Sequence, residues 1–294
     1  MTDVIERTEV PQPEPAYALA GLLGVPAPDL SEGLPPLWHW VYLLDRPAQA
    51  DLGTDGHPVR GTLPAPPGPG RRRMWAGGRV AARGPLRCGE PATRRTTVLA
   101  VTEKHGRSGH LTFVTVGVRV TQRGAVVVDE EQDIVYRDAA SAAAPPCPPA
   151  APAEVPAGPG EREIEVTPAL LFRFSALIYN AHRIHYDRDY CRDVEGYPGL
   201  LTHGPLQALA MAEAVRAARD TGRNTGRNTG RNTGRDTGGG PDGRFGGASF
   251  SYRLVSPLFD DQGLIASAAP GPDGTVVTAV RDRYGRQTAA GTFR

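Results

Sequence analysis

The sequence feature that most constrains the fold is a long-period internal repeat. RRMWAGGRVAARGPL at residues 72–86 has the same pattern as GRFGGASFSYRLVSPL at residues 243–258: an aromatic residue with glycines, a strand-like run and then Pro-Leu. Similarly, EVPQPEPAYALAGLLG corresponds to EVTPALLFRFSALIYN, and LPPLWHWVYLL to LLTHGPLQALA. A repeat of this length indicates two copies of one folding module that lie side by side.

A segment rich in Ala and Pro separates the two copies. It runs over residues 139–160 and cannot bury a core, so it should form a semi-rigid linker. The length of 294 residues also favours two units over one. We therefore expect an N-terminal module at 1–138, a linker at 139–162 and a C-terminal module at 163–294.

Within each module, helical patterns with Pro and Gly boundaries come before strands. The expected helices span 15–25 and 34–44 in the first copy, and 167–178 and 205–219 in the second. The β-branched, partly alternating runs that follow predict antiparallel strands. A long helix wrapped by such a sheet is the hotdog arrangement. Two copies predict an α+β double hotdog, with two antiparallel sheets that each surround a central helix.

Two stretches of low complexity should lie outside this framework. The Pro- and Gly-rich segment 45–73, which ends in Arg71-Arg72-Arg73, predicts a long solvated loop. The tandem repeat RDTG-RNTG-RNTG-RNTG-RDTG lies within residues 219–240 and has no apolar side chain. Because it cannot offset its ordering entropy, we expect a disordered insertion there.

Composition excludes several classes of partner. The 33 Lys and Arg residues nearly balance the 32 Asp and Glu residues, so nothing favours nucleic acid or an anionic membrane surface. The three cysteines are isolated and show no metal spacing, which favours a reducing compartment. The N-terminus is acidic and Pro-rich, and no apolar run is long enough to span a bilayer. We expect a cytoplasmic protein.

The polar chemistry is concentrated in the second copy, between residues 172 and 209. Its helices flank the loop NAHRIHYDRDYCRDVEGYPG, where the first copy has only VPAPDLSEG. One copy should therefore be structural and the other chemical. In the first copy, His39 lies between two tryptophans. It is either a catalytic imidazole or a packing residue, and the amphipathic pattern favours the packing residue.

These residues carry a family resemblance. Asn180-Ala-His-Arg-Ile-His185-Tyr-Asp187, followed by His203-Gly204, resembles the motif of the MaoC-like (R)-specific enoyl-CoA hydratases and dehydratases. LPPLWHW, RRMWAGGR, EEQDIVYR and GYPGLLTHGPL are similar to the branch of hydroxyacyl-thioester dehydratase type 2 and 3-methylfumaryl-CoA (mesaconyl-C4-CoA) hydratase. The resemblance covers nearly the whole chain and implies an acyl-thioester hydro-lyase.

Hydration of an enoyl thioester needs a base for water, an acid for the α-carbon and donors for the enolate oxygen. A histidine can serve as the base at neutral pH. His185 is the candidate because it follows a helix end and should lie over the mouth of the next helix. Gly204-Pro205 begins that helix. Pro205 has no N–H, so the oxyanion donor should be Gly204 or a neighbour such as Leu206.

The sequence departs from the general motif at three positions. Asn180 stands at the Asp position and His182 at the Asn position, and Ala212 replaces a Ser or Thr of the family. An amide cannot act as a carboxylate base. We infer that Asn180 orients the water while His185 takes and returns the proton, with His182 and Asp187 as further candidates for that work.

Arg183 stands where the general motif has Pro, and three interpretations remain open. Its guanidinium could bind a carboxylate on the substrate, as in a methylfumaryl group, or the phosphates of CoA. It could also pair with Asp187 or Asp189.

No metal or redox cofactor is expected. The chain has no phosphate loop, and His182, His185 and His203 lack a carboxylate at helical spacing. The substrate should be an acyl-CoA or acyl-carrier-protein thioester, with 3-methylfumaryl-CoA the leading candidate. A catalytically silent thioester-binding protein and a hotdog thioesterase are the alternatives. Since isolated hotdogs pair through their sheets, the internal pair leaves open a monomer or a homodimer.

Overall fold

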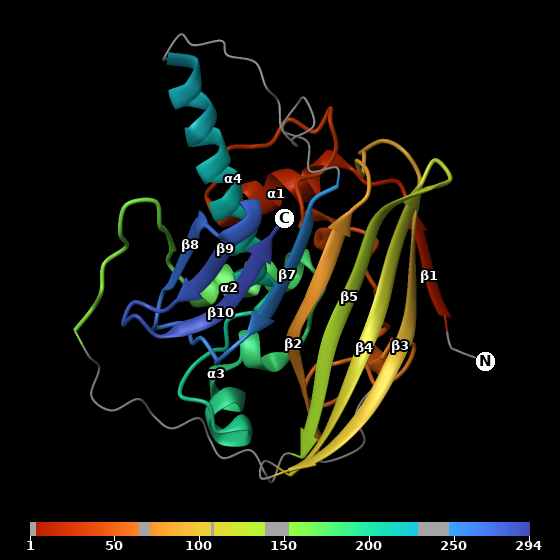
Figure 1. The fold of residues 1–294 in the computed structure, drawn as a ribbon. Helices are drawn as coiled ribbons and strands as arrows, with labels where there is room; N and C mark the ends of the chain where they lie inside the picture. The colour runs from red at the N-terminus through yellow and green to blue at the C-terminus, as the bar shows by residue number, and fades with distance from the viewer. Residues whose placement is uncertain (1–3, 65–70, 107–108, 139–152, 229–246) are drawn as a thin grey trace.

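Two sets of strands join edge to edge into one ten-stranded antiparallel sheet, in the order β1-β3-β4-β5-β2-β7-β10-β9-β8-β6 (Figure 1). The computed structural model describes residues 4–64, 71–106, 109–138, 153–228 and 247–294. The order is symmetric about the β2–β7 pair, so each strand has an equivalent in the other half. This symmetry agrees with the internal repeat, since β2 and β7 come from the two corresponding segments.

The two halves contribute equal numbers of strands. Those of the N-terminal half are β1 (Val4–Glu9), β2 (Arg71–Ala82), β3 (Ala92–Gly106), β4 (Gly109–Gln122) and β5 (Ala125–Asp138). Those of the C-terminal half are β6 (Arg162–Ile164), β7 (Ser249–Leu254), β8 (Leu264–Pro270), β9 (Val276–Arg281) and β10 (Gln287–Phe293). The longer N-terminal strands form the large curved face in Figure 1.

The helices are few and lie on one side of the sheet. The α-helices are α1 (Pro13–Leu23), α2 (Pro168–Leu177), α3 (Arg188–Tyr190) and α4 (Gly204–Asn228). The 3-10 helices are η1 (Trp38–Val41), η2 (Gln49–Asp51), η4 (Arg183–His185) and η6 (Pro272–Gly274), and η5 (Cys191–Glu195) is a π-helix. None of the helices within the described residues is both long and apolar enough to cross a bilayer.

α4 is the central helix of the C-terminal half. Pro at its second position fits the start of a helix, and the following Leu-Gln-Ala-Leu-Ala-Met run consists of good helix formers. Leu206, Leu209, Met211 and Val215 are fully buried, and the helix packs against β8, β9 and β10. Burial on nearly every side explains why the sequence is apolar around most of this segment.

The N-terminal half has no such helix, so the predicted helix at 34–44 is wrong. The 3-10 helix η1 stands where α4 stands in the other half, with Leu37 and Leu43 in the left-handed region at φ 68° and 53°. The Trp38 indole donates to Glu213 on α4, at 2.9 Å, whereas the Trp40 indole donates to Glu130, at 3.0 Å. Because tertiary contacts hold these side chains in different directions, they override the helical pattern.

Three other boundaries differ from the prediction. β2 begins at Arg71, so the loop predicted to run to residue 73 ends earlier, and Arg71, Arg72 and Arg73 pair with β5 instead of lying in solvent. α4 continues to Asn228, which makes the first part of the predicted insertion helical. The rest of that insertion, and the linker up to residue 152, lie outside the described residues.

One hydrophobic core joins the two halves, because buried residues of α1, η1, α2, α4 and both ends of the sheet form a single cluster. At the junction, the Trp75 indole of β2 donates to the Tyr252 hydroxyl of β7, at 3.0 Å. Gly77 pairs with Arg253 there, and a Cβ at Gly77 would overlap with the Tyr252 carbonyl oxygen. Main-chain pairing therefore joins the halves, and at Gly77 it leaves no room for a side chain.

Gly77→Ala should lower the free energy of unfolding by about 2 kcal/mol, because the added methyl group forces β2 and β7 apart. Urea denaturation followed by tryptophan fluorescence measures this change. Gly84→Ala is the matched control, since its Cβ would meet Val127 Cγ1 at an ordinary 3.6 Å. An equal, small effect of both substitutions would show that the junction is not tightly packed.

Candidate active site

A cavity of about 840 Å³ opens between the two halves and collects most of the candidate residues. The C-terminal half supplies His185, His203 and Gly204, and the N-terminal half supplies His57 and Trp75. A cavity of this size is typical of small-molecule sites. The N-terminal half, which the sequence analysis assigned a structural role, thus provides part of the wall.

The loop that carries the motif is built by a turn at the end of α2. Tyr179 takes a left-handed conformation at φ 53°, and the Asn180 side-chain oxygen accepts a hydrogen bond from the His182 N–H at 3.1 Å. This turn leads into η4 and points His182 and His185 into the cavity. Asn180 also lines the cavity, but its oxygen is engaged in the turn, which leaves its amide N–H groups as donors.

His185 is held as a neutral base. Its Nδ1 lies 2.7 Å from the Leu201 carbonyl oxygen, which can only accept, so Nδ1 carries the proton and Nε2 the lone pair. The ring stacks on His203 at a centroid distance of 3.5 Å. Burial lowers the pKa of His185 to about 4, with the Leu201 hydrogen bond opposing this and His57 adding to it.

Four imidazoles form a row through the site. The ring centroids of His57 and His182 are 3.8 Å apart, those of His182 and His185 5.5 Å, and those of His185 and His203 3.5 Å. Burial, and then the charge that neighbouring groups would carry, lower the pKa of His182 and His203 well below the ordinary value. The rings of His182, His185 and His203 are therefore neutral near pH 7.

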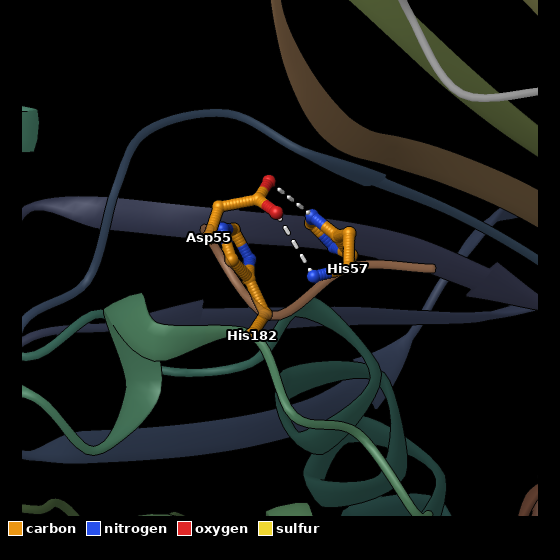
Figure 2. A group of neighbouring side chains, drawn as sticks. All are labelled: Asp55, His57 and His182. Carbon is orange, nitrogen blue, oxygen red and sulfur yellow. Dashed lines mark hydrogen bonds and ion pairs between the residues drawn. The ribbon is translucent and has the colours of Figure 1, made fainter. Parts of the chain in front are cut away.

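Asp55 and His57 bring a carboxylate to this row from the N-terminal half (Figure 2). The two Asp55 oxygens lie 3.0 Å from His57 Nδ1 and 3.0 Å from its backbone N–H. Burial raises the pKa of Asp55, but these hydrogen bonds outweigh it and hold the pKa below its ordinary value. The carboxylate is therefore ionised, and it fixes the orientation of the His57 ring.

The two loops meet through the backbone. The Arg183 N–H donates to the Asp55 carbonyl at 2.8 Å, and Arg183 Nη1 donates to the Thr54 carbonyl at 3.0 Å. Gly56 has φ 86°, and a Cβ there would overlap with the Ala181 carbonyl oxygen. Glycine is thus required at the point where the loop of one half lies against the loop of the other.

Of the three interpretations of Arg183, the structure shows the last, pairing with an aspartate. Its guanidinium forms an ion pair with Asp187 at 2.8 Å and lies over the Tyr190 ring at 4.1 Å. It is not among the residues that line the cavity. Its contacts position the 54–57 loop rather than reach a ligand there.

Gly204 presents the start of α4 to the cavity. A Cβ at this residue would overlap with Leu254 Cδ1 and would lie 3.6 Å from Trp75 Cδ1. The first N–H groups of a helix have no intrahelical acceptor, and the helix dipole makes this end attractive to a negative oxygen. Leu206 is fully buried and does not line the cavity, so Gly204 is the better placed of the two candidate donors.

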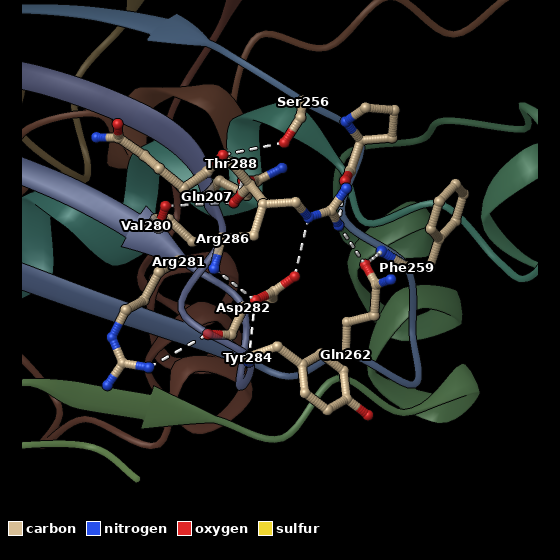
Figure 3. A network of polar contacts seen from close by, with 12 residues as sticks. Gln207, Ser256, Phe259, Gln262, Val280, Arg281, Asp282, Tyr284, Arg286 and Thr288 are labelled. Atoms are coloured by element: carbon tan, nitrogen blue, oxygen red, sulfur yellow. Dashed lines mark hydrogen bonds and ion pairs between the residues drawn. The ribbon is translucent and has the colours of Figure 1, made fainter. Parts of the chain in front are cut away.

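A polar network anchors this helix start to the sheet (Figure 3). Thr288 of β10 donates to the Gln207 side chain of α4 at 2.8 Å. The buried Asp282 accepts from Arg286, and Arg286 Nη2 donates to the Pro257 carbonyl at 3.0 Å. The next carbonyl, of Leu258, accepts from Thr202 N–H at 2.8 Å. Both sides of the His203-Gly204 turn are therefore fixed.

His39 lies at the cavity wall as well. It is buried, and its Nε2 lies 2.9 Å from Glu130, which also accepts from Trp40 and Gln132. Its burial agrees with the packing residue that the amphipathic pattern favours, and it also lines the cavity.

Two clusters within the described residues bring ligand atoms close enough to hold a cation: Asp55 with His57 and His182, and Glu103 with His105 and His110. His182, His185 and His203 do not form such a group in the described structure. In the first cluster, His57 Nδ1 faces Asp55, so a proton on that nitrogen would compete with a cation.

Comparisons with known proteins show the family to which the chain belongs. Residues 37–231 match the model of the family "Hydroxyacyl-thioester dehydratase type 2". The chain is also 49% identical over 205 residues to mesaconyl-C(4)-CoA hydratase from Chloroflexus aurantiacus, covering 68% of this chain and 71% of that protein. The chain belongs to the hydroxyacyl-thioester dehydratase type 2 family. It is therefore an acyl-thioester hydro-lyase, as the motif predicted.

Two solved structures of other proteins have a fold similar to that of this chain. A MaoC-like dehydratase from Phytophthora capsici matches with a TM-score of 0.62 and 13% identity, over 99% of this chain and 94% of that one. A Mycobacterium tuberculosis protein described as a double hotdog matches with a TM-score of 0.55 and 14% identity, over 99% and 94%. The predicted α+β double hotdog is confirmed, although its two sheets are continuous and, among the described residues, only the C-terminal half has a central helix.

Asp55, His57 and Arg73 line this cavity, but sequence reasoning did not single them out as site residues. All three fell within the Pro- and Gly-rich stretch predicted to be a solvated loop. The only local signal was Asp-Gly-His at 55–57, a turn sequence flanked by two titratable side chains. Nothing in one sequence shows that this turn lies against Ala181.

Because these histidines are neutral in the folded enzyme, its free energy of unfolding should fall on mild acidification. Unfolded His185 takes up a proton as the pH falls through its ordinary pKa of 6.5, whereas the folded enzyme does so only near 4. The free energy of unfolding should therefore decrease from pH 7.5 to 5.5, by about 1 kcal/mol from His185 alone. His182 and His203 act in the same direction.

Urea denaturation at a series of pH values tests this dependence above the range where carboxylates titrate. His185→Gln should show a weaker decrease than the native chain. Identical slopes for the two proteins would mean that His185 is not held neutral by burial.

Proposed function

We propose that this enzyme reversibly hydrates mesaconyl-C4-CoA, adding hydroxide to the β-carbon and a proton to the α-carbon of the enoyl thioester. One observation carries the proposal: the neutral His185, with its Nε2 lone pair available, lines the same cavity as the exposed start of α4 at Gly204. The 49% identity to a protein with that name supports the choice of substrate.

In this mechanism, the thioester oxygen lies at the start of α4. The Gly204 N–H and the positive end of the helix stabilise the negative charge that develops on that oxygen when water adds. Because Leu254 and Trp75 enclose Gly204, water has little access to compete for the donor.

His185 Nε2 takes the proton from water as its oxygen bonds to the β-carbon. The protonated ring then returns a proton to the α-carbon, so the base is regenerated and one water is consumed. A low pKa makes the imidazole a weaker base but a stronger acid, which suits the second step. Asn180 can orient the water through its amide N–H groups, since its oxygen is engaged with the His182 N–H.

The Asp55–His57 pair compensates for the missing family carboxylate. Asn180 occupies the position of that carboxylate and cannot accept a proton, whereas His57 lines the same cavity and is oriented by an ionised Asp55. With Nδ1 donating to Asp55, His57 Nε2 can accept a hydrogen bond from the attacking water or from His182. The site would thus combine groups from both modules.

The remaining assignments follow the sequence analysis. The enzyme acts in the cytoplasm, needs no metal or redox cofactor, and uses a CoA thioester or, as the second choice, an acyl-carrier-protein thioester. The enzyme is either a homodimer or a monomer. In the monomer, the β2–β7 pair already joins the two modules.

His185→Gln should lower kcat/KM for hydration of mesaconyl-C4-CoA by about 1000-fold, because the variant has no group to move the proton. The decay of enoyl absorbance and a mass increase of one water follow the reaction. Release of free thiol instead would identify a thioesterase.

The control is His110→Gln, which removes a histidine from the β3–β4 hairpin, outside the cavity. Its activity should match that of the native enzyme. Full turnover by His185→Gln would remove His185 from the mechanism.

His57→Gln and Asp55→Asn should each lower kcat by about 10- to 100-fold with a smaller effect on KM, because they impair proton transfer rather than binding. Steady-state kinetics on both variants, with circular dichroism to confirm folding, measure the effect. An unchanged kcat in His57→Gln would show that His185 works without this pair.

A further inference from the structure

Three consecutive arginines begin β2, and they do not have the same surroundings. Arg71 forms an ion pair with Asp138 at 3.4 Å, and Arg72 with Glu195 at 2.8 Å. The Arg73 side chain forms no ion pair or hydrogen bond with any of the residues that the structure describes. The third guanidinium therefore differs from its neighbours in having no anion on the protein.

Arg73 lies in the cavity, close to the groups that would carry out the reaction. It is two residues before Trp75 on β2, so both side chains project from the same face of the strand, about 7 Å apart along it. Trp75 adjoins Gly204 at the start of α4. On its other side, Arg73 pairs across the sheet with Tyr136 of β5.

The neighbours of Arg73 cannot neutralise it. Asp55 interacts with it at longer range, but both Asp55 oxygens accept hydrogen bonds from His57. Burial raises the pKa of Tyr136, so its hydroxyl is neutral near pH 7. Burial also lowers the pKa of Arg73, which shows that the guanidinium is poorly hydrated.

An unpaired guanidinium in a shielded cavity is costly unless a ligand brings an anion. We propose that Arg73 binds the carboxylate that the substrate carries on its β-carbon, and so selects short dicarboxylic acyl thioesters over simple acyl thioesters. The inference deepens the proposed function and rests on it, because mesaconyl-C4-CoA carries such a carboxylate. The planar guanidinium can hold it through two parallel hydrogen bonds.

Other cavity arginines fit this role less well. Arg94 pairs with Asp45 at 2.6 Å, and Arg71 and Arg72 have the partners given above. Arg183, the candidate from the sequence, pairs with Asp187 outside the cavity. Arg73 lies near Trp75, which adjoins Gly204. A substrate that places its thioester at Gly204 and its carboxylate at Arg73 must therefore have a short acyl chain.

Binding of two unreactive thioesters tests the inference without relying on turnover. Succinyl-CoA and butyryl-CoA differ only in a terminal carboxylate against a methyl group, and titration calorimetry gives Kd for each. The native enzyme should bind succinyl-CoA about 10- to 100-fold more tightly. Arg73→Met should remove this preference by weakening the binding of succinyl-CoA, while Kd for butyryl-CoA stays within about 3-fold of the native value.

Two further variants keep the result interpretable. Arg73→Lys retains the charge but not the paired donors, so part of the preference should remain. Arg79→Gln is the matched control, because Arg79 is an exposed arginine of the same strand that pairs with Glu131 and Asp133. It should bind both thioesters as the native enzyme does.

The outcomes separate the two proposals. No preference in the native enzyme, or a preference that survives in Arg73→Met, would overturn the carboxylate site even if mesaconyl-C4-CoA is hydrated. Loss of the preference in Arg73→Met supports the site, and it does so even if mesaconyl-C4-CoA is not hydrated, in which case the proposed function fails and the carboxylate site remains.

Discussion

The pairing of β2 with β7 is the interaction on which the site depends. It joins two sheets into one and fixes Trp75 against Tyr252 through a hydrogen bond. Because β2 carries Arg73 and Trp75 on its inner face, the same pairing brings them to the start of α4. The cavity is thus a product of the junction between the halves rather than of either half.

Burial sets the chemistry of this cavity. Desolvation keeps the imidazoles of His182, His185 and His203 neutral, and a hydrogen bond to the Leu201 carbonyl decides which His185 nitrogen is free. At the same time, the enclosed guanidinium of Arg73 and the carboxylate of Asp55 place opposite charges near that row. A low local dielectric strengthens these fields, so a small number of groups can orient a polar substrate.

The sequence alone predicted the duplicated α+β architecture, its antiparallel strands and the family. It did so because strand alternation, helix boundaries and motif spacing are local or periodic signals. It failed at residues 34–44, where Trp38 and Trp40 reach distant carboxylates, and at Arg73, which resembles a loop residue until its partner strand is known. Likewise, Asp55 and His57 join the site through contacts between loops far apart in the chain.

The close approach of Gly56 to Ala181 has an evolutionary consequence. Once two fused copies of a module share a reaction centre, they cease to be independent, and a change in one copy must be matched in the other. Recombination between relatives would therefore have to exchange the 54–57 and 180–187 loops together. A copy without the motif can be retained after duplication because it has become part of the wall of its sister's cavity.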